Sequence, residues 1–278
     1  MKIHTLLYLA GISLLPMTPL RAIEVIAHRG ASFAAPENTL SALRLAWEEG
    51  AGTAEVDVRL TKDGKIVLMH DDTLERTAAQ PGRVAETTLA AIRKLDVGLW
   101  KDPSFTGERI PTLDEALAAT PSGRTLVIEI KCGIEIVEPL VETLNRSSKP
   151  SKEIILISFD YEVLKALKRE IPPYRAYWLL GYEPNFPLEE IFSTYITLSK
   201  EAGLDGLNLG IEWPLDAPTA RRVLDNGLRI LVWTIDDPEL ARVWIKRGAT
   251  AVTTNRPAFM MDALGVKKLA PSPNDIQP

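Results

Sequence analysis

Short apolar runs alternate with segments of helical spacing along most of this chain. Eight runs are rich in valine, isoleucine and leucine and end at polar or glycine residues, as buried strands do. The predicted strands are Ile23–Ala27, Thr53–Val58, Leu126–Ile130, Ile154–Ser158, Ala176–Leu180, Gly206–Leu209, Arg229–Thr234 and Ala251–Thr253. The predicted helices cover 38–49, 112–119, 135–146, 160–169, 187–202, 216–226 and 237–247. Because strands that alternate with helices form parallel sheets, eight such units predict an α/β fold, a closed (β/α)8 TIM barrel.

Two segments after the second strand depart from this repeat. Residues 58–71 form a predicted hairpin with the turn Thr61-Lys62-Asp63-Gly64. The run Ile66–Met69 is then antiparallel to the second strand and forms an arm above the barrel mouth. Residues 72–111 follow as a small insertion module with a predicted helix over 88–95.

The two ends of the chain differ in composition from the repeat. Residues 1–22 resemble a secretory signal peptide, with a basic start, an apolar stretch over 6–15 and a predicted cleavage point after Ala22. This predicts a periplasmic or secreted protein, the alternatives being a retained anchor or a start codon placed too early. The barrel domain is expected over 23–265, and a disordered tail over 266–278.

The charge of the chain limits the classes of partner that it can bind. The 278 residues carry a net charge of −5, and removal of Lys2 and Arg21 with the signal peptide gives −7 (−5 − 2). An acidic protein binds nucleic acid and anionic membranes poorly, and nothing after residue 22 approaches transmembrane length. We therefore expect a small-molecule substrate, no nucleic acid, no stable membrane insertion after signal removal, and a monomer or homodimer. The single Cys132 cannot form an internal disulfide and is expected to be a small buried residue.

Acidic residues interrupt two predicted strands. Glu55 and Asp57 lie two residues apart on the second strand and share a face, and Glu129 and Lys131 repeat this arrangement on the third. Three buried carboxylates without a cation would repel one another at a considerable cost in free energy. Glu55, Asp57 and Glu129 are suited to bind one divalent cation, calcium or magnesium, which leaves Lys131 to bind an anion. The alternative is a metal-free cluster of salt bridges in which Lys131 neutralises the acids.

Histidine is scarce in this chain, which contains 3, and His4 lies in the predicted signal peptide. His28 and His70 each end an apolar run, and hairpin pairing brings His70 back beside the two acids of the second strand. Two histidines are the minimum for an acid–base pair that acts near neutral pH. Together with the cation, and with Arg29 and Lys131 on a phosphate, they predict a metal-assisted phosphodiesterase.

Three further polar or aromatic residues are candidates for the substrate pocket. Asn38 follows Glu37 at the start of a predicted helix and either lines the pocket or simply caps the helix. Trp233 and Asn255 end the seventh and eighth strands. Trp233 either forms an apolar wall for the alcohol portion of a substrate or packs in the core.

These residues occur in motifs that resemble the glycerophosphodiester phosphodiesterase family, in family order over roughly residues 23–265. The motifs are His28-Arg29-Gly30, Pro36-Glu37-Asn38-Thr39, Glu55-Val56-Asp57, Thr61-Lys62-Asp63-Gly64, His70-Asp71, Ile110-Pro111-Thr112-Leu113, Glu129-Ile130-Lys131, Val232-Trp233-Thr234 and Thr254-Asn255.

The resemblance implies a TIM barrel that hydrolyses deacylated phospholipids to an alcohol and sn-glycerol 3-phosphate. It implies a divalent cation on Glu55, Asp57 and Glu129, with His28 and His70 as general acid and base. It further implies that Arg29 and Lys131 bind the phosphate and that the insertion module helps to cover the site. In related phosphodiesterases a substrate hydroxyl attacks first and gives a cyclic phosphate. Which histidine takes which step does not follow from the sequence.

Two other functions fit parts of the pattern. A phospholipase D-like enzyme acting on lysophospholipids would need an apolar groove or an interfacial surface, and the chain has no aromatic-rich amphipathic segment. A non-catalytic phosphodiester-binding protein would need only Arg29, Lys131 and a cation, so that the two histidines would be superfluous.

Overall fold

The computed structural model describes residues 23–182, 184 and 187–270. The predicted signal peptide over 1–22 and residues 271–278 of the predicted tail lie outside these residues. The strands are β1 (Glu24–Ala27), β2 (Thr53–Leu60), β3 (Ile66–Leu68), β4 (Thr125–Ile130), β5 (Ile154–Ser158), β6 (Arg175–Leu180), β7 (Gly206–Gly210), β8 (Arg229–Trp233) and β9 (Ala251–Thr254). The α-helices are α1 (Leu40–Glu48), α2 (Glu75–Ala78), α3 (Leu89–Ile92), α4 (Leu113–Ala119), α5 (Val137–Arg146), α6 (Tyr161–Glu170), α7 (Leu188–Glu201), α8 (Ala217–Asp225), α9 (Pro238–Arg247) and α10 (Pro257–Leu264).

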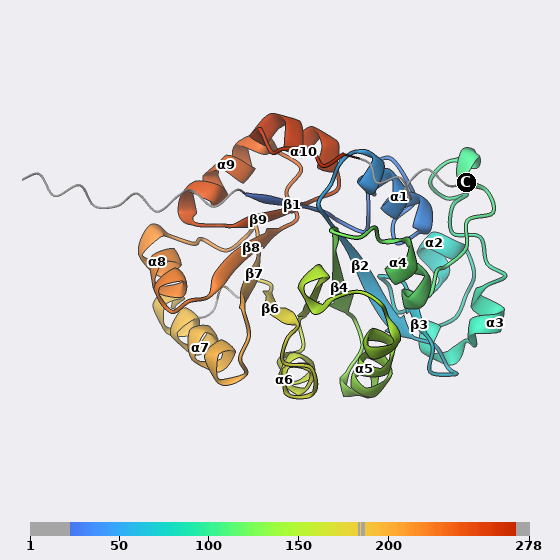
Figure 1. Ribbon diagram of the computed structural model, residues 1–278, viewed down its shortest axis with the longest axis horizontal. Coiled ribbons are helices and arrows are strands. Elements are labelled where there is room, and N and C mark those ends of the chain that lie inside the picture. The colour runs from blue at the N-terminus through green and yellow to red at the C-terminus, as the bar shows by residue number, and fades with distance from the viewer. Residues whose placement is uncertain (1–22, 183, 185–186, 271–278) are drawn as a thin grey trace, which may run out of the picture.

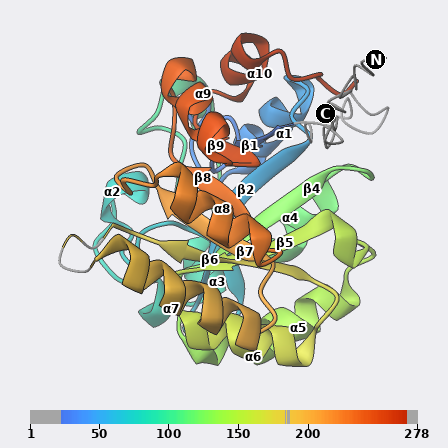
Figure 2. The same cartoon turned by 90° about the vertical axis from the view of Figure 1, so that its left-hand side faces the viewer.

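Eight parallel strands of the described chain close into a barrel. Their order is β1-β9-β8-β7-β6-β5-β4-β2, and pairing between β1 and β2 completes the ring. Helices surround the sheet (Figure 1), and α7, α8 and α9 cover the strands on the side that faces the viewer in Figure 2. The predicted TIM barrel is therefore confirmed, with every predicted strand present to within a few residues of its predicted ends.

Alternating side chains divide the strands between two apolar layers. Residues such as Val56 and Ile128 pack outward against the helices. Residues such as Ile26, Val127 and Tyr177 fill the inside of the barrel. Toward the mouth the inward positions become polar, since β2 carries Glu55, Asp57 and Arg59 there and β4 carries Glu129.

The hairpin and the insertion module lie beside β2, as the sequence predicts. Strand β3 is antiparallel to β2, with Val58 opposite Leu68 and Leu60 opposite Ile66. The elements α2 and α3 lie outside the ring of helices, next to β3 (Figure 1). A small apolar core of its own joins the module to the hairpin, and it contains Val67, Met69, Leu74, Val84, Ile92, Val97 and Ile110.

The structure departs from the prediction in several places. The helix predicted over 88–95 is confined to Leu89–Ile92. The helix α10 was not predicted, because its sequence is apolar on most sides and shows no amphipathic spacing. The tail predicted over 266–278 begins too early, because Leu269 N donates to Gly50 O and Ala270 O accepts from Arg124. Within the described residues, no helix combines the length and apolar character needed to cross a bilayer.

Candidate active site

Three carboxylates meet where β2 and β4 approach the barrel mouth. Parallel register pairs Asp57 directly with Glu129, and Glu55 lies two residues before Asp57 on the same inward face. One oxygen from each of the three lies within 4.8 Å of the others, and all three residues are buried. The two-residue spacing of Glu55 and Asp57 on β2, with the pairing of Asp57 to Glu129 on β4, brings the three predicted metal ligands together.

These acids are poorly satisfied by protein groups alone. Glu55 Oε1 and Asp57 Oδ1 are buried and have no hydrogen-bond partner among the described residues. Burial, and then the charge of Asp57, raises the pKa of Glu55 well above its ordinary value and raises that of Glu129 to about 7. Oxygen donors in this number and proximity fit a hard divalent cation.

Two basic residues are already ion-paired with the carboxylate cluster. Arg29 Nε lies 3.1 Å from Asp57 Oδ2, and its Nη1 donates to Glu37 Oε1 at 2.8 Å. Lys131 Nζ donates to Glu129 Oε1 at 2.6 Å and lies 3.7 Å from Asp57 Oδ1. The ion pairs expected for a metal-free cluster of salt bridges are therefore present. Within the described residues, Glu55 Oε1 and Asp57 Oδ1 still lack a hydrogen-bond partner.

A chain of hydrogen bonds fixes the ring of His28. His28 Nδ1 lies 2.7 Å from Asn255 Oδ1, and Asn255 Nδ2 donates to Asp236 Oδ2 at 2.7 Å. Because a carboxylate only accepts, Asp236 turns the amide oxygen of Asn255 toward His28, which must then carry its proton on Nδ1. Burial, and then the charge of Arg29, lowers the pKa of His28 to about 4. His28 is therefore a neutral imidazole with Nε2 free to accept a proton.

His70 is held in a different electrostatic environment. Its Nδ1 lies 2.7 Å from Asp71 Oδ1, and its side chain is about one-third exposed. Burial lowers its pKa, while the carboxylates of Asp57 and Asp71 oppose that shift. Because a carboxylate stabilises the imidazolium, His70 binds a proton more readily than His28 does.

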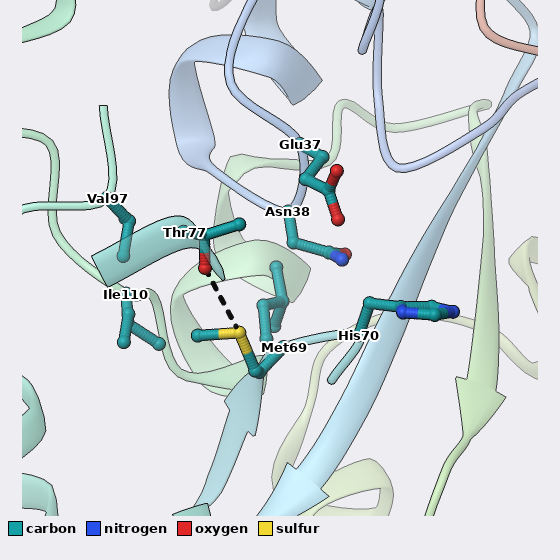
Figure 3. A pocket seen from close by; sticks show the side chains of 8 residues that line it. Glu37, Asn38, Met69, His70, Thr77, Val97 and Ile110 are labelled. Atoms are coloured by element: carbon teal, nitrogen blue, oxygen red, sulfur yellow. Dashed lines mark hydrogen bonds between the residues drawn. The ribbon is translucent and has the colours of Figure 1, made fainter. Parts of the chain in front are cut away.

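The insertion module contributes a positively charged side chain, Arg76, to this side of the site. Arg76 of α2 donates to both carboxylate oxygens of Glu37 and of Asp71. These bonds, with the charge of Arg29, lower the pKa of Glu37 to about 2 although burial opposes the shift. Figure 3 shows Glu37 and His70 beside the small pocket between the hairpin and α2. Arg76 thus links the insertion module to Asp71, the hydrogen-bond partner of His70.

Two other residues position the ends of the strands. Asn38 Nδ2 donates to Asp57 Oδ2 at 2.7 Å, and Asn38 Oδ1 accepts from the Asp57 amide. The helix cap is Thr39, so the interpretation of Asn38 as the cap is wrong, and Asn38 instead orients a predicted metal ligand. Arg59 donates to the carbonyls of both His70 and Lys131, which joins the ends of β3 and β4.

An aromatic wall stands beside Lys131. The ring of Phe159 packs edge-on against Trp233 with centroids 5.5 Å apart, and Lys131 Nζ lies 5.7 Å from the Phe159 centroid. Trp233 Nε1 donates to Asn208 O, so its indole is fixed and half-buried at the end of β8. Trp233 packs against the inner core, and its second interpretation, as an apolar wall for the alcohol portion of a substrate, stays a prediction.

Sequence reasoning did not single out six residues of this constellation as site residues, namely Glu37, Arg59, Asp71, Arg76, Phe159 and Asp236. Glu37 and Asp71 lie next to predicted site residues, and their adjacency in polar motifs was the available signal. Arg76 and Asp236 gave no such signal, because their partners are 39 and 19 residues away and depend on loop conformation.

Comparison with known proteins gives consistent matches. The family described as "Glycerophosphoryl diester phosphodiesterase family" matches residues 28–259. A glycerophosphodiester phosphodiesterase of Caldanaerobacter subterraneus is 35% identical over 243 residues, which cover 86% of this chain and 96% of that protein.

Solved structures agree with the sequence matches. A phosphodiesterase of Oleispira antarctica, in complex with the product sn-glycerol 3-phosphate, is 31% identical with a TM-score of 0.79. The match covers 88% of this chain and 97% of that one. A glycerophosphodiester phosphodiesterase of Thermotoga maritima is 27% identical with a TM-score of 0.71, over 86% of this chain and 97% of that one.

Proposed function

Because this chain belongs to the glycerophosphoryl diester phosphodiesterase family, we propose that its barrel mouth cleaves glycerophosphodiesters between two unequal histidines, His28 and His70. The chain is an enzyme that hydrolyses these diesters to an alcohol and sn-glycerol 3-phosphate. The observation that carries the proposal is the convergence of both histidine segments on Asp57: Arg29, next to His28, lies 3.1 Å from its carboxylate, and the Met69 amide, next to His70, donates to its carbonyl at 3.0 Å.

The two histidines have complementary environments in this proposal. Neutral His28, whose Nδ1–H is committed to Asn255, takes a proton through Nε2 from the attacking hydroxyl group or water. His70, beside Asp71, gives a proton to the departing alkoxide as the phosphorus–oxygen bond breaks. This assignment of base and acid extends the sequence prediction, which left the two roles open.

The remaining polar residues would hold the phosphate. Glu55, Asp57 and Glu129 would bind one divalent cation, calcium or magnesium. When bound, the cation would polarise the phosphoryl oxygens and neutralise developing charge. Arg29 and Lys131, at the edge of the cluster, would exchange part of their ion pairing with the acids for contacts to phosphate oxygens. Trp233 and Phe159 would border the alcohol group.

Substitution of each histidine tests the assignment. We expect His28→Ala and His70→Ala to lower kcat on glycerophosphocholine by about 10²- to 10⁴-fold, the contribution of a positioned acid or base. The matched control is Asp72→Ala, because Asp72 lies two residues after His70 and pairs with Arg83 on the surface. Near wild-type hydrolysis by either histidine variant would remove that residue from the mechanism.

Chelation tests the cation separately. Protein treated with EDTA should lose hydrolysis and regain it with calcium or magnesium, and Glu129→Gln should respond weakly to both ions. Full activity in the metal-free protein would contradict the proposed metal site.

The cellular location rests on the first 22 residues. The basic start and the apolar stretch over 6–15 support export to the periplasm or the medium. Sequencing the N-terminus of the protein purified from its native cells tests this, and an intact Met1 would contradict cleavage after Ala22.

A further inference from the structure

Exposed large apolar side chains gather at one end of the barrel. Of the 10 such residues in the described chain, 7 lie on segments that follow the C-terminal ends of strands or on the insertion loop beside them. These 7 residues, the mouth ring, are Phe33, Leu99, Trp100, Ile134, Phe159, Tyr182 and Phe259. Exposed apolar side chains that gather at one end of a protein mark a candidate interaction surface.

Strand order places the mouth ring on opposite sides of the opening. Phe33 follows β1 and Phe259 follows β9, while Phe159 and Tyr182 follow β5 and β6. In the barrel order, β6 lies four strands from β1, and β5 lies four strands from β9. The apolar side chains therefore flank the active site rather than forming a patch to one side of it.

The insertion loop belongs to the same ring. Lys101 Nζ donates to Ser32 O at 2.7 Å, which fixes the Leu99 and Trp100 segment beside the loop that carries Phe33. The loop before α10 joins this side as well, because Phe33 N donates to Asn255 O.

Basic side chains accompany the exposed aromatic rings. The Arg256 guanidinium lies 4.5 Å from the Phe33 centroid and 4.6 Å from that of Phe259. Lys101 Nζ lies 5.9 Å from the Trp100 centroid. Aromatic rings paired with cations suit the boundary between acyl chains and phosphate headgroups, where the rings enter the apolar zone and the cations meet phosphate.

We propose that the mouth ring docks on a layer of zwitterionic phospholipid, which places the active site against phosphodiester headgroups. This inference rests on the proposed function, because it takes the barrel mouth to be the entrance for glycerophosphodiesters. The cations beside the aromatic rings, Arg256 and Lys101, favour a partner that presents phosphate groups above an apolar layer.

Vesicle sedimentation tests the docking surface. The full-length protein is mixed with phosphatidylcholine vesicles, and the bound fraction is compared with that of Phe33→Ser/Leu99→Ser/Ile134→Ser. These residues are the most exposed of the ring, at 60%, 55% and 58%. The matched control is Leu224→Ser/Val243→Ser/Leu269→Ser, which changes the exposed apolar residues away from the mouth. We expect the mouth variant to bind at least about tenfold more weakly and the control to bind like the wild type.

Hydrolysis of soluble glycerophosphocholine separates this inference from the proposed function. It should be unchanged in both triple variants, since none of the six side chains belongs to the proposed catalytic, metal-binding or phosphate-binding groups. The docking proposal is overturned if the wild type does not bind vesicles, if the mouth variant binds as well as the wild type, or if the control loses binding equally. It is also overturned if light scattering shows that the ring joins two copies in solution. Failure of the wild type to hydrolyse the soluble substrate would instead count against the proposed function.

Discussion

At the scale of single residues, the Asp236 carboxylate determines which ring nitrogen of His28 carries the proton. Asp236 accepts three hydrogen bonds, from Thr254 Oγ1, from the Asn255 amide and from Asn255 Nδ2. It therefore determines which end of the Asn255 side chain faces His28. In the proposed mechanism Asp236 is a positioning residue, because it would act on the reaction only through Asn255.

Replacement of Asp236 should change the tautomer of His28. Without the carboxylate the Asn255 amide can rotate, so Asp236→Ala should lower kcat by about tenfold, or about 1.4 kcal/mol of activation free energy. The KM should change much less. Imidazole ¹⁵N resonances should show His28 protonated on Nδ1 in the wild type and on both nitrogens in turn in the variant.

The neighbouring Asp237 provides the control. It caps α9 and accepts from Glu239 N, so Asp237→Ala should cost about 1 kcal/mol of stability and leave the His28 tautomer unchanged. An unchanged tautomer and kcat in Asp236→Ala would show that Asp236 has no positioning role.

How far the sequence predicts such residues depends on the range of their contacts. Glu55, Asp57 and Glu129 followed from the two-residue period of strands, which is a local rule. Asp236 and Arg76 acquire their roles from contacts between segments that meet only in the folded chain. The mouth ring was not predicted for a related reason, since its seven members lie on six separate segments and an exposed Phe33 has no distinctive local pattern.

At the scale of elements, the barrel requires close approach between β7 and β8. A Cβ atom on Gly206 would lie 2.1 Å from Arg229 O, so any side chain there would force the two strands apart. The prediction of β7 from an apolar run contained no information on this contact, because it is set by the packing of the neighbouring strand.

We expect Gly206→Ala to destabilise the protein by about 1–3 kcal/mol or more through this overpacking. The matched variant is Gly52→Ala, whose Cβ would meet only Leu269 Cδ1 at an ordinary 3.5 Å. Its free energy of unfolding should lie within about 0.5 kcal/mol of the wild type. Urea unfolding measures both, and equal stabilities would refute the steric argument.

The insertion module should influence catalysis through Arg76. Arg76→Ala removes positive charge beside Asp71 and His70, so the pKa of His70 should rise. An acid must be protonated to act, and the alkaline limb of the kcat/KM profile should therefore move to higher pH. Stability should change by less than about 1 kcal/mol, because Arg76 is 43% exposed.

The control for this prediction is Arg83→Ala, which removes another arginine of the same module, one that pairs with Asp72. It should leave the pH profile unchanged. A shift of the alkaline limb to lower pH in Arg76→Ala would contradict the assignment of His70 as the acid.

At the scale of the whole molecule, the carboxylate cluster links folding to pH and to the cation. The barrel buries Glu55, Asp57 and Glu129 in an acidic chain with a net charge of −5. Burial raises the pKa of Glu129 from its ordinary 4.5 to about 7 in the folded protein. The metal-free native state therefore binds more protons than the unfolded chain between these two values.

This linkage predicts how the melting temperature depends on pH. A raised carboxyl pKa contributes stability that is present below pH 4.5 and is lost as the pH rises through about 7. In EDTA, the contribution of this cluster should therefore lower the melting temperature as the pH rises from 5 to 8. A bound divalent cation takes the place of the protons, so the increase in melting temperature produced by calcium or magnesium should grow over the same range.

Circular dichroism melts in EDTA and in each metal, at several pH values, measure both trends. Glu129→Gln is the internal comparison, because its amide keeps the shape of the carboxyl without its charge. In that variant the decline in EDTA should be shallower and the gain from the metal smaller. If the metal raised the melting temperature equally at pH 5 and pH 8, protons and cation would not compete for the same carboxylates. The cluster of Glu55, Asp57 and Glu129 would then not be the cation site.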